Sequence, residues 1–95
     1  MTVIVRIIAL AGGTGTASSP HEGRWVRYWN PHTRAGVCEL ETTVNRAEAR
    51  RFASPDEVMA EWRTVSDVEA RRPWDGEPNR PLTGLSIQTQ AVFDA

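Results

Sequence analysis

Residues 54–65, SPDEVMAEWRTV, decide the fold, because they combine a helix start with a helical apolar stripe. Ser54 is a preferred N-cap residue, and Pro55 is preferred at the first helical position. Glu57 stands three residues after the cap, as in a capping box. The three residues together predict a helix that begins at Pro55.

The apolar residues of this segment fall on one side of the predicted helix. Val58, Trp62 and Val65 stand at positions i, i+4 and i+7, with Met59 alongside. A stripe on a single helix has to cover something, and a sheet is the natural partner in a chain of 95 residues. The acidic residues of the helix face elsewhere; these are Asp56, Glu57 and Glu61.

Four segments around the helix have strand patterns. Residues 2–10 are rich in Val and Ile on both alternating faces, interrupted only by Arg6, which is typical of a buried, central strand. Residues 24–29 and 37–44 alternate on either side of a turn and predict a hairpin. Residues 82–93 alternate again and predict a long closing strand, with its apolar side formed by Leu85, Ile87, Thr89, Ala91 and Phe93.

Loops and short turns join these segments. Residues 11–23 hold four glycines and no periodicity, which predicts a long loop. Asn45 is positioned to cap a short helical turn over residues 46–51. Residues 66–80 predict an extended loop with a turn at Asp75-Gly76.

The order of elements predicts the fold class α+β. We expect one domain over residues 1–95, with a four-stranded, mainly antiparallel sheet (β-β-β-α-β) and one main helix packed on one face. A partly open small barrel is an alternative. Parallel pairing of the closing strand with an inner strand is another, because the helical crossover is long enough.

The composition of the chain excludes some classes of binding partner. The net charge is −1, all eleven basic residues are Arg, and no stretch reaches the roughly 20 apolar residues of a membrane span. We expect no membrane partner and no overall attraction to nucleic acid. The N-terminal apolar run lacks a basic start and contains Arg6, so we expect no signal peptide and a cytoplasmic protein. A single cysteine, Cys38, fits a reducing compartment.

Three patterns resemble catalytic or cofactor sites without completing one. The glycine-rich residues 11–16 follow a strand, but the chain has no Lys for a phosphate loop and no helix start directly after the glycines. His21, His32 and Cys38, with Glu39 or Glu22, lack metal-ligand spacing. Cys38 faces inward on its predicted strand, where a thiol is inert. We therefore expect a protein that is not an enzyme and has no cofactor or metal.

The best binding candidate is one face of the strand over residues 24–29. Trp25, Arg27 and Trp29 alternate onto that face, and large rings with a planar cation are typical of interface hot spots and of base-stacking sheets. The same rings could instead be the bed for Trp62 of the helix, which would turn Val26 and Tyr28 outward. The sequence pattern leaves both possibilities open.

Charged residues form two further candidate surfaces. Six arginines fall within residues 46–72, but acidic residues interleave with them, which favours a salt-linked face. Acidic side chains that could imitate nucleic-acid phosphates complete the candidate contact surface; they are Glu39, Glu41, Glu57 and Glu61.

Several segments resemble a family of small phage and prophage proteins. They are RAEARRF at residues 46–52, SPDEVMAEWR at 54–63 and DGEPNRPLT at 75–83. The family has no assigned activity, so the resemblance implies no catalytic or ligand residues. It implies a small accessory protein that binds a host protein or complex, such as an anti-CRISPR-like inhibitor of a host defence complex. A single-stranded nucleic-acid-binding module and a minor virion component are the alternative functions.

Overall fold

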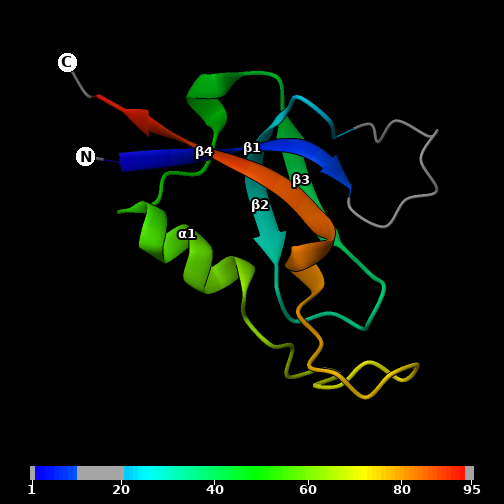
Figure 1. Ribbon diagram of the computed structural model, residues 1–95. Coiled ribbons are helices and arrows are strands. Elements are labelled where there is room, and N and C mark those ends of the chain that lie inside the picture. Colours follow the sequence, from blue (N-terminus) through cyan, green and yellow to red (C-terminus); the bar gives the residue numbers. More distant parts are fainter. Residues whose placement is uncertain (1, 11–20, 94–95) are drawn as a thin grey trace.

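A computed structural model describes residues 2–10 and 21–93 of the chain (Figure 1). The sheet has four strands in the order β3-β2-β1-β4, and every neighbouring pair is antiparallel. The predicted α+β class and the β-β-β-α-β order are confirmed, and the barrel and parallel alternatives are wrong. The elements are β1 (Thr2–Leu10), β2 (Trp25–Asn30), β3 (Glu39–Thr43), α1 (Pro55–Trp62) and β4 (Leu85–Val92), with 3-10 turns at Arg46–Glu48 and Pro81–Gly84.

β1 lies inside the sheet, as its apolar pattern predicted. It pairs with β4 from Thr2 opposite Val92 to Leu10 opposite Leu85. The closing strand is shorter than predicted, because Pro81–Gly84 forms a 3-10 turn before β4 begins. Phe93 lies beyond the strand and is 82% exposed, so it is not part of the buried face.

Residues 50–52 lie between β1 and β2 along part of the length of the two strands. Arg6 pairs with Trp25, but Val3 instead exchanges two backbone hydrogen bonds with Phe52, at 2.9 and 2.8 Å. The backbone N–H of Arg50 donates to the carbonyl of Val26, at 2.9 Å. In Figure 1, β1 and β4 lie across the view, whereas β2 and β3 lie steeply to them.

The helix α1 begins where the sequence predicted. The Ser54 hydroxyl accepts the backbone N–H of Glu57 at 3.3 Å, and the Glu57 carboxylate accepts the backbone N–H of Ala53 at 3.1 Å. The helix ends at Trp62, so Val65 lies outside it and is partly exposed. No described helix is long and apolar enough to cross a membrane.

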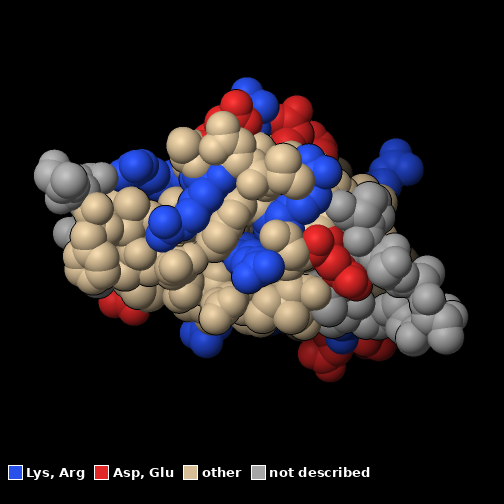
Figure 2. Space-filling model, turned by 90° about the horizontal axis from the view of Figure 1, so that it is seen from above, with Lys and Arg blue, Asp and Glu red and all other residues tan. Residues whose placement is uncertain are grey.

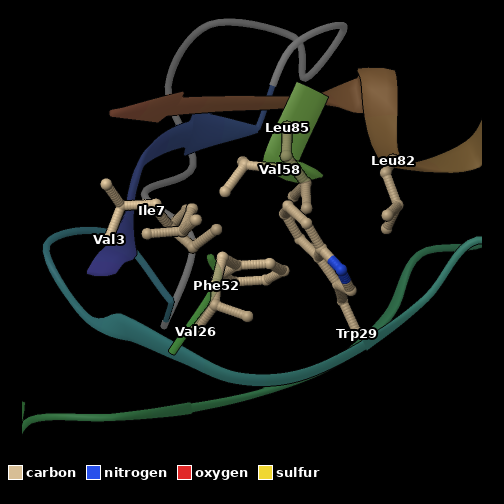
Figure 3. Packing of buried hydrophobic residues seen from close by; sticks show 9 residues of the cluster. Val3, Ile7, Val26, Trp29, Phe52, Val58, Leu82 and Leu85 are labelled. Atoms are coloured by element: carbon tan, nitrogen blue, oxygen red, sulfur yellow. The ribbon is translucent and has the colours of Figure 1, made fainter. Parts of the chain in front are cut away.

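The core lies between α1 and one face of the sheet, here called the inner face. Figure 3 shows Val26, Trp29 and Phe52 in contact, with Val58 of α1 and Leu85 of β4 above them. Trp29 and Phe52 stack as tilted rings with centroids 5.7 Å apart. The remaining buried members of the cluster are Val3, Val5, Ile7 and Leu82.

Candidate functional site

The predicted face of Trp25, Arg27 and Trp29 does not exist, because β2 contains a bulge. The register with β3 shifts between Val26, which pairs with Thr42, and Tyr28, which pairs with Glu41. Arg27 is the extra residue, so the alternation reverses after it. Trp29 is 2% exposed in the core, whereas Trp25 is half-buried and Arg27 is exposed.

Glu61 is part of a half-buried polar contact beside the core and not of an acidic surface. Its carboxylate accepts the indole N–H of Trp29 at 3.0 Å and two hydrogen bonds from the Arg50 guanidinium, at 3.0 and 2.8 Å. Arg50 also lies 4.3 Å from the centroid of the Phe52 ring. The prediction that Glu61 faces away from the core is therefore wrong.

The other predicted acidic residues lie on opposite sides of the molecule. Glu39 and Glu41 are exposed on β3, where the intervening Leu40 packs against the core. Alternation places both carboxylates on the outer face, opposite the side covered by α1. Glu57 lies in the first turn of α1. The four acidic residues therefore do not form one surface.

The helical turn predicted over residues 46–51 is present but covers only Arg46–Glu48, and the strand predicted before it, over residues 37–44, is also shorter. The Asn45 side chain accepts the backbone N–H of Ala47 at 3.0 Å. Glu48 accepts the hydroxyl of Thr43 at 2.9 Å. β3 covers Glu39–Thr43, and Val44, the last residue of the predicted strand, lies beyond it and is exposed.

The candidate metal and nucleophile residues are held in structural contacts. His21 Nδ1 lies 2.7 Å from the Thr42 hydroxyl, and His32 Nδ1 contacts Asp67 through both its carboxylate and its backbone N–H. Burial raises the pKa of the Cys38 thiol, which donates to the carbonyl of Pro81 at 3.2 Å. Within residues 2–10 and 21–93, no three His, Cys, Asp or Glu side chains gather in a way that could hold a metal ion. The glycine-rich residues 11–16 lie outside the described residues.

Residues 66–80, here called the arm, project from the body of the molecule (Figure 1) and end in a tightly bonded turn. The backbone N–H of Gly76 donates to the carbonyl of Arg72 at 2.9 Å, and that of Arg72 donates to the carbonyl of Glu77 at 2.8 Å. The Arg72 guanidinium donates two hydrogen bonds to the Asp75 carboxylate, at 2.9 and 2.5 Å. Gly76 has a φ of +72°, which confirms the predicted turn and favours glycine.

Trp74 lies at the tip of this turn and is 62% exposed. The Arg72 guanidinium lies 5.9 Å from the centroid of its ring. The ring also approaches Gly36 of the β2–β3 connection, where an added Cβ would lie 4.0 Å from it. The Trp74 ring is thus exposed to solvent on a turn whose backbone hydrogen bonds restrict its conformation.

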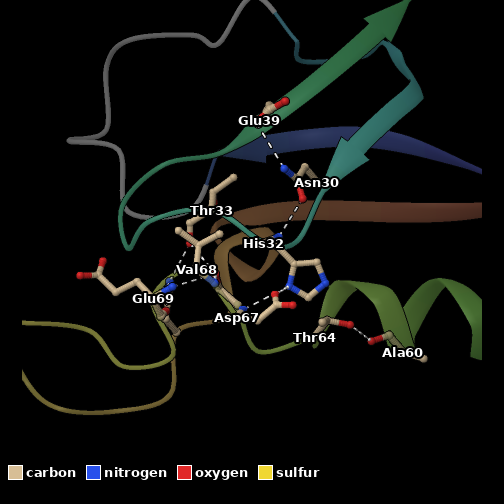
Figure 4. Close-up of polar contacts among 11 residues, drawn as sticks. Asn30, His32, Thr33, Glu39, Ala60, Thr64, Asp67, Val68 and Glu69 are labelled. Carbon is tan, nitrogen blue, oxygen red and sulfur yellow. Dashed lines mark hydrogen bonds and ion pairs between the residues drawn. The ribbon is translucent and has the colours of Figure 1, made fainter.

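The base of the arm is bonded to the β2–β3 connection. Asn79 is buried, and its amide donates to the carbonyls of Thr33 at 3.1 Å and Glu69 at 2.8 Å. The Ser66 hydroxyl donates to the same Thr33 carbonyl at 2.7 Å. Figure 4 shows His32 of the connection facing Asp67 of the arm. These contacts fix the direction in which the arm leaves the body.

A second feature lies on the outer face of the sheet. The guanidinium groups of Arg6 and Arg46 lie 5.7 and 5.8 Å from the centroid of Trp25. Figure 2 shows basic side chains across the middle of one face, with most acidic side chains towards its margins. Tyr28, which the reversed alternation brings to this face, is 43% exposed.

Sequence reasoning missed Trp74, which belongs to none of the predicted surfaces. A signal was available: the ring stands in a segment of prolines and charges, RRPWDGEP, with no apolar periodicity that would bury it. Asn79 was also missed, because nothing local distinguishes a buried amide from an exposed one.

Comparison with known proteins assigns no relative: no family model, no curated protein and no solved structure matches the chain.

Proposed function

We propose that this chain is an accessory protein that acts by binding another protein, with Trp74 at the centre of the contact. The observation that carries the proposal is a Trp side chain 62% exposed at the tip of a bonded turn. Trp is among the residues that dominate binding energies at interfaces. A contact residue held in place beforehand also loses little conformational freedom on binding.

The surroundings of Trp74 suit a partner surface with an apolar pocket and a rim of mixed charge. Arg71 and Arg72 precede the ring, and Asp75 and Glu77 follow it. The resemblance to phage proteins supports a host defence complex, such as a CRISPR complex, as the target and inhibition as the outcome. We do not assign Glu57 or Glu61 to imitation of nucleic-acid phosphates, since both bond within the chain.

The test is capture of a host protein by the tagged chain and by Trp74→Ala. The wild-type chain should retain a stoichiometric protein from a host lysate, and Trp74→Ala should weaken that binding by at least about tenfold, as expected for a hot spot. Tyr28→Ala is the matched control, because it removes an exposed ring on another surface. Lack of a stoichiometric partner, or undiminished capture by Trp74→Ala, would contradict the proposal.

The outer face supports a second candidate function, binding of single-stranded nucleic acid. Two guanidinium groups close to Trp25 provide charge and stacking planes together. Binding to an oligonucleotide should weaken steeply as salt is raised, and Arg6→Gln should weaken it further while Trp74→Ala does not. A chain that fails to shift an oligonucleotide at low salt does not have this function.

A further inference from the structure

β4 is an edge of the sheet, and half of its backbone groups point away from β1. In an antiparallel pair, directly opposite residues either both bond across the pair or both point outward. Val3 of β1 uses its N–H and C=O on Phe52, and Ile7 uses its own on residues 23 and 24, so both point away from β4. On β4, Ala91 lies opposite Val3 and Ile87 lies opposite Ile7, so the backbone N–H and C=O groups of both residues point outward. The same holds for Thr89, which lies midway between them.

Leu85 gives an independent check of this alternation. Its carbonyl accepts the indole N–H of Trp62 at 3.1 Å, and its backbone N–H donates to the carbonyl of Leu82. Both groups thus bond to residues outside the β1–β4 ladder, as the alternation requires. The available run of the edge begins at Ile87, because the groups of Leu85 are used.

The two edges of the sheet differ in how they are protected. β3 is five residues long and carries two exposed carboxylates, Glu39 and Glu41. β4 is eight residues long, LSIQTQAV, without a charge or a proline. Natural edge strands are usually short or carry charges, prolines or bulges that prevent further pairing. The one register shift in its pairing lies between Ile7 and Ala9 of β1, so residues 87–92 of β4 form a regular edge that could pair with a further strand.

An uncharged groove runs beside this edge on the inner face. It is a hollow of about 480 Å³ between α1 and β4, and its apolar lining includes Met59, Trp62, Leu85 and Ile87. A strand added to β4 would place alternate side chains over this groove. Phe93, the residue directly after β4, is 82% exposed and is not part of the core of its own chain.

We propose that the chain pairs with a second copy of itself by antiparallel addition of β4 to β4, with Thr89 on the twofold axis. In this register Ile87 lies opposite Ala91 of the other copy, and the outward groups form about six hydrogen bonds. Phe93 then lies opposite Leu85 of the other copy, on the same side of the sheet as the groove. Each copy supplies both the groove and the ring that fills it, which favours a second copy over a foreign strand.

The test is the solution mass of the chain and of charged variants at position 89. The wild type should sediment at twice 10.6 kDa as its concentration rises. Thr89→Lys and Thr89→Glu should each be monomeric, because they place like charges opposite one another on the axis. An equimolar mixture of the two should form a heterodimer. Gln90→Lys is the control: it adds the same charge one residue away, opposite Gln88, and should still dimerise.

Phe93→Ala tests the register without adding a charge. It should weaken dimerisation by at least about tenfold, because each copy loses the burial of one ring. A wild type that stays at 10.6 kDa near millimolar concentration would overturn the proposal, as would a Thr89→Lys protein that dimerises like the wild type. A monomer that instead takes up a foreign extended peptide along β4 would assign the edge to another partner and also overturn it.

Discussion

Glu61→Ala should lower the free energy of unfolding by about 2 kcal/mol, whereas Glu61→Gln should lower it by less than about 1 kcal/mol. The Glu61 carboxylate accepts the indole N–H of Trp29, whose ring is 2% exposed, and it also binds the Arg50 guanidinium. Alanine removes both interactions. Glutamine keeps an oxygen that can accept from Trp29 and from one Arg50 nitrogen, and it loses the charge and the second hydrogen bond from Arg50.

The magnitude follows from the burial of each group. A buried donor left without an acceptor costs about 1–3 kcal/mol. The Arg50 and Glu61 side chains are each about one-third exposed, so their ion pair is worth about 0.2–1 kcal/mol. Loss of both interactions should therefore cost roughly twice as much as loss of the ion pair, or more.

Urea unfolding followed by circular dichroism measures the difference, since Trp29 fluorescence would itself respond to the substitution. For a domain of this size the midpoint of thermal unfolding should fall by roughly 8–16 °C in Glu61→Ala. Glu77→Ala is the control, because it removes an exposed carboxylate of the arm. Equal destabilisation by Ala and Gln, or a change below about 0.5 kcal/mol in Glu61→Ala, would refute the reasoning.

Two other substitutions test the arm and the thiol. Asn79→Ala removes two bonds donated by a buried amide, so the backbone amides of residues 66–80 should exchange hydrogen roughly tenfold faster or more; unchanged exchange would show that the amide does not hold the arm. Because burial raises the pKa of Cys38, its native thiol should react with iodoacetamide more slowly than the unfolded thiol at pH 8–9. The raised pKa stabilises the fold fully below the unfolded pKa, and that contribution is lost as the pH rises through the folded value. Cys38→Ser should remove this part of the alkaline loss of stability, and equal labelling of native and unfolded thiols would contradict the assignment.

The fold was largely predictable because its elements carry local signals. The cap at Ser54, the Val and Ile residues of β1 and the alternation of β4 each specify an element without reference to the rest of the chain. These elements can be assembled in few ways, and one antiparallel sheet covered by one helix satisfies all of their apolar faces.

The binding surfaces were less predictable because each depends on contacts between distant residues. The bulge at Arg27 arises in the pairing of β2 with β3, and no pattern in the sequence of residues 24–29 predicts it. It moves Trp29 into the core and brings Tyr28 outward. Glu61 has the sequence position of a solvent-facing carboxylate, but Trp29 and Arg50 reach it only after the chain has folded. Strand parity predicted from sequence therefore holds only as far as the first bulge.

The pairing of β1 with β4 has a consequence for synthesis on the ribosome. β1 is made first, yet its longest partner strand ends at Val92 and emerges among the last described residues. Contacts between residues so far apart in sequence form slowly, because a long loop must close first. Until then the Val- and Ile-rich β1 is left with unpaired backbone groups, in the form most prone to aggregation. We expect that nascent chains stalled before Leu85 remain unfolded and need a chaperone, whereas chains that extend past Val92 fold in a single cooperative step.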